Sequence, residues 1–175
     1  MAPQAEMLLF AAARAQLVAE VITPALRRGR CVVCDRYVDA SLAYQGVGRG
    51  LGIEIVRHVN AVATGGLAPD LTLLLDIAVA TGLRRARAES GTGPLAALGE
   101  TPLGVRGSGD RMEQQGLAFH ERVREGFLEL AQNEPRRIRV IDARGSVAAV
   151  QREIERVVDV FLRGRERGPG GEGSR

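Results

Sequence analysis

The side chains best suited to chemistry follow a short apolar run near residue 30. The run 31–34 is followed by Asp35, Arg36 and Tyr37, and then by Ser41, Tyr44 and Gln45. Buried strands of parallel sheets read as continuous apolar runs, and ligands of open α/β sheets lie beyond the carboxyl ends of the strands. An arginine there can bind a phosphate bidentately, and a neighbouring carboxylate can hold a metal-bound water or orient the arginine. The alternative is a structural ion pair between Asp35 and Arg36 at the end of a strand.

Phe10 and Arg14 form a second candidate pair, because residues four apart lie on one face of a helix. Together they could stack on a base and hydrogen-bond its edge. The alternative is a core aromatic residue beside a solvated arginine, since pairs of this kind are common on helices.

A third group of arginines surrounds a segment rich in Gly, Pro, Ser and Thr. The group consists of Arg84, Arg85, Arg87, Arg106 and Arg111, the last of which lies in the stretch Asp110–Glu113. The segment 90–109 is longer than most connections, and long loops are often lids. Arginines that close over a transferring phosphate neutralise its developing charge. The alternative is a solvated basic helix surface, followed by a helix whose first turn carries acids that suit its dipole.

Several other patterns can be excluded. The sequence contains no lysine, so all 24 of its Lys and Arg residues are arginine. No P-loop of the form GxxxxGK[ST] is therefore present, because its lysine must reach the β- and γ-phosphates. The glycine-rich segment 46–52 does not lie between a strand and a helix, as dinucleotide binding requires. Positions three apart in a strand point to opposite faces, so we expect Cys31 and Cys34 to pack in the core rather than share a metal.

The composition is that of an ordinary globular protein, with 45% hydrophobic and 26% charged residues. No apolar stretch is long enough to span a bilayer, and the N-terminus lacks the basic start of a signal peptide. A cytoplasmic location is therefore expected. The net charge of +3 and the 3% aromatic content argue against a nucleic-acid-binding surface, which needs a clustered basic patch or a stacking platform.

The apolar patterns and the turn residues predict alternating helices and strands. Helices are expected over 5–28 with a kink at Pro24, and over 38–46, 53–64, 78–89, 111–133 and 146–163; strands are expected over 30–34, 71–76 and 137–142. This alternation predicts an α/β fold in which a parallel sheet has helices on both faces. One domain over 1–163, with a lid loop at about 90–109, would precede a disordered tail over 164–175. Since doubly wound nucleotide-binding sheets usually have five or more strands, the fold is expected to be N-terminally incomplete.

Five segments, in order, resemble the bacterial thymidylate kinase family. They are EMLLFAAARAQLV, VVCDRYVDASLAYQGVGRGL, APDLTLLLDIAVATGLRRAR, DRMEQQGLAFHERVREGFLELA and VIDA, and they cover nearly the whole chain up to about residue 163. Any single segment would be weak evidence, but the DRY segment with its downstream S-x-x-Y-Q is specific. The resemblance implies the P-loop fold of nucleoside monophosphate kinases, whose first strand, P-loop and following helix would lie before residue 1.

The resemblance also implies roles for residues at an acceptor site for thymidine monophosphate (dTMP). Phe10 would stack on thymine, and Arg14 would donate a hydrogen bond to the thymine carbonyl at position 4. Arg36 would bind the phosphate of dTMP, with Asp35 beside it as the residue near Mg²⁺. The base would be lined by Ser41 and Gln45, and Tyr44 would crowd the sugar 2′ position and so favour deoxyribose.

Further residues would serve the phosphate donor. The resemblance places Arg87, Arg111 and Glu113 in the lid, where with Asp35 and Arg36 they would take part in catalysis. The residues assigned to ATP are Arg84, Ala143 and Arg144, the last two beside adenine.

The implied reaction is transfer of the ATP γ-phosphate to dTMP to give dTDP, with Mg²⁺, in a homodimer that engages neither nucleic acid nor membrane. Removing one donor to the transferred group commonly costs about a hundredfold in rate. Because no P-loop or lysine occurs in these residues, we expect little or no kinase activity from the chain alone. The alternative function is a non-catalytic nucleotide-binding or dimerisation module with helix 5–28 as its partner surface.

Overall fold

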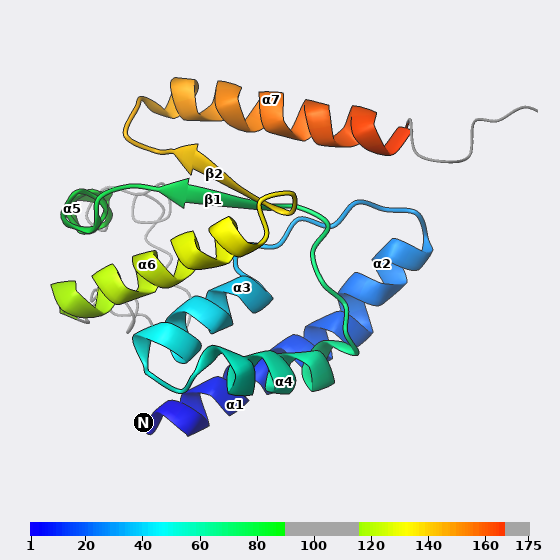
Figure 1. Cartoon of the computed structure of the whole chain (residues 1–175). Helices are drawn as coiled ribbons and strands as arrows, with labels where there is room; N and C mark the ends of the chain where they lie inside the picture. Colours follow the sequence, from blue (N-terminus) through cyan, green and yellow to red (C-terminus); the bar gives the residue numbers. More distant parts are fainter. Residues whose placement is uncertain (90–115, 167–175) are drawn as a thin grey trace, which may run out of the picture. The chain divides into compact units, whose positions relative to one another are not determined.

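A computed structural model describes residues 1–89 and 116–166 of the chain. The elements in order are α1 (Pro3–Leu17), the π-helix η1 (Val18–Ile22), α2 (Thr23–Arg27), α3 (Val38–Ser41), the π-helix η2 (Leu42–Gly48), α4 (Ile53–Thr64), β1 (Thr72–Asp76), α5 (Val79–Glu89), α6 (Leu117–Asn133), β2 (Ile138–Asp142) and α7 (Val147–Glu166) (Figure 1). They form two compact units. The first comprises Met1–Ala68 and Ala78–Glu129, and the second comprises Pro69–Ile77 and Leu130–Arg175. The C-terminal end of α6 is grouped with the second unit.

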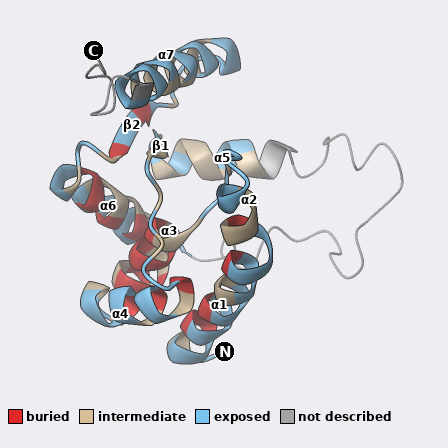
Figure 2. Ribbon diagram, turned by 90° about the vertical axis from the view of Figure 1, so that its right-hand side faces the viewer, coloured by how far each residue is buried: buried red, intermediate tan, exposed pale blue. Residues whose placement is uncertain are grey.

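The first unit is helical, and its core lies among α1, η2, α4 and α6. Figure 2 shows buried residues on α1, α3, α4 and α6. The apolar side chains of this core include Met7 and Ala11 of α1, Leu42 and Ala43 at the start of η2, Val56 of α4, and Phe119 and Val123 of α6, all at most 7% exposed. Burial of such side chains provides the main driving force for this unit.

The predicted kink at Pro24 is confirmed as a change in helix type. A proline has no N–H to donate to the carbonyl four residues earlier, and its ring crowds that carbonyl. The chain passes through the π-helix η1 before α2, in which Pro24 occupies the first turn. The N–H of Thr23 donates to the carbonyl of Val18, five residues earlier, which is the hydrogen bond of a π-helix.

Helix α4 has the bounds predicted from its flanking glycines. Gly52 precedes it, and Gly65 ends it with a φ of 61°, in the left-handed region that glycine adopts without steric cost. The N–H of Gly66 then donates to the carbonyl of Ala61 at 3.0 Å, which satisfies one carbonyl of the last turn.

The second unit contains the parallel sheet that the sequence predicts. β1 and β2 pair in parallel, with Leu74 opposite Val140 and Asp76 opposite Asp142, and α7 packs against β2. Ile138 and Ile141 are 4% and 1% exposed. These two residues are three apart, so they face opposite sides of the strand. Since both are buried, β2 is covered on both faces, as in α/β proteins. The α/β class is confirmed, and α7 extends to Glu166, beyond the predicted end at residue 163.

The predicted strand over residues 30–34 is wrong. No strand is assigned there, Val33 is 92% exposed, and Cys31 and Cys34 are exposed free thiols. Strand pairing needs a neighbouring backbone, and within the described ranges β1 and β2 pair only with one another. The predicted core packing of the two cysteines is wrong for the same reason, since it presumed a buried strand.

Three further predictions concern residues that the structure does not describe. The loop predicted at 90–109 lies wholly outside the described residues, as do the start of the helix predicted at 111–133 and the tail from 167 onward. Among the residues that are described, no helix combines the length and hydrophobicity needed to cross a lipid bilayer.

The contact between η2 and α6 depends on Gly48. A Cβ at this position would lie 2.6 Å from Cγ2 of Val123 and 2.9 Å from Cε2 of Phe119, both buried side chains. We expect Gly48→Ala to lower the free energy of unfolding by about 1–3 kcal/mol, because a methyl group in a filled core displaces its neighbours. Urea unfolding followed by circular dichroism measures the change.

Gly164 provides a matched control for that experiment, since it lies in α7 and nothing is within 4 Å of a Cβ placed there. Gly164→Ala should raise the free energy of unfolding by about 0.5–1 kcal/mol through helix propensity. An unchanged stability for Gly48→Ala would contradict the close packing of η2 on α6.

Candidate functional site

All of the predicted acceptor-site residues belong to the first unit. Phe10 and Arg14 lie on α1, Asp35 and Arg36 lie in the coil before α3, Ser41 ends α3, and Tyr44 and Gln45 lie on η2. The candidate residues between 35 and 45 therefore lie on consecutive, contacting segments of this unit, even though residues 30–34 do not form the predicted strand.

Arg14 is the most heavily bonded of these side chains. Its Nη2 donates to Oγ of Ser41 at 2.9 Å and to the backbone carbonyl of Tyr37 at 3.3 Å, and its Nη1 donates to Oδ1 of Asn60. Its Cζ lies 5.6 Å from the centre of the Tyr37 ring. Burial lowers the pKa of Arg14, and the neighbouring Tyr37 partly offsets this effect. The guanidinium is thus held by α3, α4 and the coil before α3.

Tyr37 shares this environment and was not predicted as a site residue. Its hydroxyl donates to the backbone carbonyl of Leu67 at 3.2 Å. Burial raises the pKa of the Tyr37 hydroxyl, while Arg14 acts in the opposite direction. The Tyr37 ring is thus held beside Arg14 by the bond of its hydroxyl to Leu67.

Arg36 is exposed and lies against an aromatic ring. Its Cζ is 5.2 Å from the centre of the Tyr44 ring, at a distance typical of cation–π contacts. Tyr44 in turn packs against Phe119 and Phe127, with ring centres 6.2 Å and 6.0 Å away. Arg36 has a φ of 62° and is the one non-glycine residue with positive φ in the described ranges. Such strain in a bulky residue often accompanies function, because surrounding structure must maintain it.

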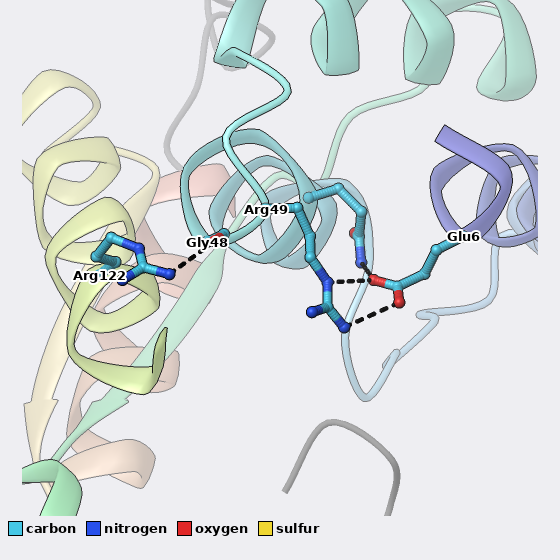
Figure 3. A network of polar contacts seen from close by, with 5 residues as sticks. Glu6, Gly48, Arg49 and Arg122 are labelled. Carbon is cyan, nitrogen blue, oxygen red and sulfur yellow. Dashed lines mark hydrogen bonds and ion pairs between the residues drawn. The ribbon is translucent and has the colours of Figure 1, made fainter. Parts of the chain in front are cut away.

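Gln45 contacts a buried carboxylate. Its side chain is 2% exposed and donates from Nε2 to Oε1 of Glu6 at 3.0 Å. Arg49 donates to the same carboxylate from Nε at 3.1 Å and from Nη2 at 3.0 Å, while Arg122 of α6 donates to the backbone carbonyl of Gly48 (Figure 3). These bonds tie α1, η2 and α6 together. The amide of Gln45 is thus engaged in anchoring η2 to α1.

Phe10 and Asp35 are accessible. The Phe10 side chain is 44% exposed on α1, one turn before Arg14. Asp35 is exposed and precedes Arg36 directly. Mg²⁺ in phosphoryl-transfer sites is commonly held by one or two carboxylates together with substrate phosphates. Asp35 is an accessible carboxylate next to Arg36, so these two side chains are the ones that could hold such an ion together with a phosphate. The described residues contain no cluster of three or more His, Cys, Asp or Glu side chains that could bind a metal without a substrate.

The residues predicted to contact the phosphate donor are less completely described. Arg84 is exposed on α5, and Arg87 belongs to the same helix, but its side chain is outside the described part. Arg111 and Glu113, with Arg106 and the loop around them, are also outside it. In the second unit, the N–H of Ala143 donates to the carbonyl of Asp76 at 2.9 Å.

Arg144 pairs with Asp142 at the end of β2. Its Nη2 is 2.7 Å from Oδ2 of Asp142, and its backbone N–H donates to Oδ1 at 2.9 Å. These hydrogen bonds lower the pKa of the Asp142 carboxyl to about 2. Arg144 is thereby oriented just after β2, although both side chains remain exposed.

Asn60 is the functional candidate that sequence reasoning missed. It occupies the middle of α4, where Val56, Asn60 and Thr64 are the buried residues. No local pattern marked it, because a sequence does not show that an amide within a helix is buried and bonded to a residue far along the chain.

Comparisons with known proteins agree on one family. The thymidylate kinase family model matches residues 1–154. The chain is 52% identical to a thymidylate kinase of Syntrophotalea carbinolica over 148 residues, which are 85% of this chain and 63% of the relative. It is also 52% identical to a thymidylate kinase of Deinococcus radiodurans over 141 residues, which are 81% of this chain and 60% of the relative. A thymidylate kinase of Roseiflexus sp. is 46% identical over 166 residues, with 93% of this chain and 70% of the relative covered.

The match extends over most of this chain, but the chain spans only about three fifths of the length of the first two relatives. The matched range 1–154 includes every acceptor-site residue predicted from the sequence, from Phe10 to Gln45, together with Ala143 and Arg144. The chain belongs to the thymidylate kinase family.

Proposed function

We propose that this chain provides the acceptor-nucleotide site of a kinase that transfers the γ-phosphate of ATP to dTMP and releases dTDP and ADP. Family membership supports the reaction, and the arrangement of Arg14 and Arg36 supports the acceptor. Arg14 donates to the base and Arg36 to the phosphate, and Phe10 stacks on the thymine ring. The Tyr44 ring, packed against two phenylalanines, limits the room beside the sugar and favours deoxyribose.

The observation that carries this proposal is the set of bonds around Arg14. A guanidinium has five N–H groups, and three of those on Arg14 have partners among the described residues. The remaining two can donate to a ligand while the others keep the group in place. A preorganised donor of this kind binds a fixed acceptor at little entropic cost. The thymine carbonyl at position 4 is such an acceptor.

Ser41 and Gln45 contribute by positioning other groups. The hydroxyl of Ser41 holds Arg14, and Gln45 anchors η2, which carries Tyr44. The resemblance implies that both residues line the base. Because they are only 4% and 2% exposed, we propose that they shape the wall around the base through the groups that they hold.

Mg²⁺ would be held by Asp35 together with phosphate oxygens, and it would neutralise negative charge on the transferred phosphoryl group. Arg36 would orient the acceptor phosphate for in-line attack. We assign Arg84, Ala143 and Arg144 to ATP and Arg87, Arg111 and Glu113 to the lid. We also propose that the protein works as a cytoplasmic homodimer.

Binding of dTMP tests the acceptor site directly. Isothermal titration calorimetry of the 175-residue chain should give saturable dTMP binding in the range of about 1 µM to 1 mM that is typical of enzyme substrates. The exposed Arg30, in the same coil as Arg36, provides a control. Arg30→Gln should leave the affinity within about twofold, because a solvated charge contributes little.

The outcome of the titration separates the proposed function from its alternatives. Absence of saturable dTMP binding would contradict the acceptor site. Chromatographic assay for dTDP with ATP and Mg²⁺ then tests the transfer. Binding of dTMP without any dTDP, even when a P-loop-containing segment is supplied, would favour the non-catalytic nucleotide-binding module.

A further inference from the structure

Asn60 is a polar residue on the buried face of α4. The buried residues of this helix, Val56, Asn60 and Thr64, are four apart and face the same side. Only 1% of Asn60 is exposed. Because a buried amide is costly unless its polar atoms are bonded, the partners of Asn60 indicate its role.

The hydrogen bonds of Asn60 determine which way its amide points. Its Nδ2 donates to the backbone carbonyl of Val56 at 2.7 Å. A carbonyl can only accept, so this bond identifies the nitrogen and directs Oδ1 toward Nη1 of Arg14. The contact joins α4 to α1, whose residues here are 46 positions apart in the sequence. Asn60 thus presents a fixed acceptor to one end of the guanidinium.

The other end of the guanidinium is held independently. Nη2 of Arg14 donates to Oγ of Ser41 at 2.9 Å and to the carbonyl of Tyr37 at 3.3 Å. With both terminal nitrogens engaged, the planar group can neither rotate nor slide along α1. The direction of the two N–H groups that remain is therefore set by these partners.

We propose that Asn60 is a positioning residue that fixes the free N–H groups of Arg14 and so makes the site prefer a base with a carbonyl oxygen over one with an amino group at the same place. The inference rests on the proposed function, in which Arg14 contacts thymine. A guanidinium is a donor only, so it cannot pair with an amino group that also donates. A free arginine side chain would turn away from that clash, whereas a fixed one excludes the amino-bearing base.

Two nucleotides test this effect. 5-Methyl-dCMP keeps the methyl group, sugar and phosphate of dTMP, replaces the carbonyl at position 4 with an amino group and turns N3 from a hydrogen-bond donor into an acceptor. The change at N3 is the same for every protein variant, so it cancels when the variants are compared. The measured quantity is the ratio of the two dissociation constants, obtained by calorimetry. Asn60→Leu keeps the size of the side chain and removes the acceptor, so it should lower the preference for dTMP about tenfold or more. Asn60→Asp keeps an acceptor for Arg14 and should hold the ratio within about threefold of the unsubstituted chain.

Val56→Ala is the matched control. It removes the two buried γ-methyl groups of a side chain on the same face of α4 and leaves the carbonyl that accepts from Asn60 in place. This variant should weaken packing but keep the ratio within about threefold, because Arg14 retains its partners. If circular dichroism shows that Asn60→Leu does not fold, Asn60→Ser replaces it, since the serine hydroxyl is too short to reach Arg14.

An equal loss of affinity for both nucleotides in Asn60→Leu, with the ratio unchanged, would overturn this inference and leave Asn60 a structural residue. That result would not affect the proposed function if the unsubstituted chain still prefers dTMP. Failure of the unsubstituted chain to bind either nucleotide would overturn both.

Discussion

Replacing Arg36 with glycine should remove dTMP binding and leave the fold about as stable as before. A charge-assisted hydrogen bond contributes about 1.5–3 kcal/mol, so losing the phosphate contacts of Arg36 should weaken binding about a hundredfold or more. The backbone at Arg36 has a φ of 62°, a conformation that glycine adopts without strain and that other residues adopt at a cost of about 1–2 kcal/mol. That relief offsets the loss of the cation–π contact with Tyr44 and the higher chain entropy of glycine.

Arg36→Ala separates the two effects. Alanine removes the same guanidinium but retains a Cβ in the left-handed region, so binding should fall as far as in the glycine variant. Its free energy of unfolding should be about 1 kcal/mol lower than that of Arg36→Gly. Calorimetry measures the first quantity and urea unfolding the second. An alanine variant at least as stable as the glycine variant would show that the positive φ does not persist in solution.

Removing the carboxylate of Glu6 should produce a large loss of stability. Its side chain is 4% exposed, and it receives hydrogen bonds from Gln45 and from two nitrogens of Arg49. Glu6→Leu would leave the Arg49 guanidinium, 18% exposed, without this partner. Breaking a buried ion pair on one side costs about 3–5 kcal/mol, and the partial exposure of Arg49 places this case near the lower end. Urea unfolding measures the loss.

A double-mutant cycle tests the explanation. Arg49→Met should cost at least as much as Glu6→Leu, since it removes the arginine partner of the more deeply buried charge. The double variant should cost less than the sum of the two, because neither member of the ion pair then remains without the other. Glu54→Ala is the control: its ion pair with Arg57 joins side chains that are 76% and 47% exposed, and its loss should change stability by at most about 0.5 kcal/mol. Additive effects of Glu6→Leu and Arg49→Met would contradict a direct contact in solution.

Much of the secondary structure could be predicted because its causes are local. Gly52 and Gly65 bound α4 where expected, and Pro24 alters the first long helix at the predicted place. β1 and β2 form where strands were predicted from their apolar residues, and they end at Asp76 and Asp142. In each case, the residues that determine the element lie within a few positions of it.

The strand predicted over 30–34 failed because its cause is not local. An apolar run indicates only that a segment would be stable if it were buried. Hydrogen bonding to a neighbouring strand decides whether that segment forms a strand. In the described ranges no such neighbour pairs with it, and Val33 is exposed. Arg36 nevertheless lies against Tyr44, with its Cζ 5.2 Å from the centre of the ring, since a short connection keeps these two residues close.

By itself the sequence determined the family and the α/β class, and it indicated the groups that we propose to bind a nucleotide, because these depend on residue type and order. Only the tertiary structure decided how those groups are held. Arg14 is fixed by Asn60, and Arg49 is paired with Glu6, across separations of 46 and 43 residues. Such contacts arise when helices pack, and no local pattern specifies which distant polar side chain will meet another. The residue types therefore determine which chemical groups the site contains, while the packing of α1, η2 and α4 determines its geometry.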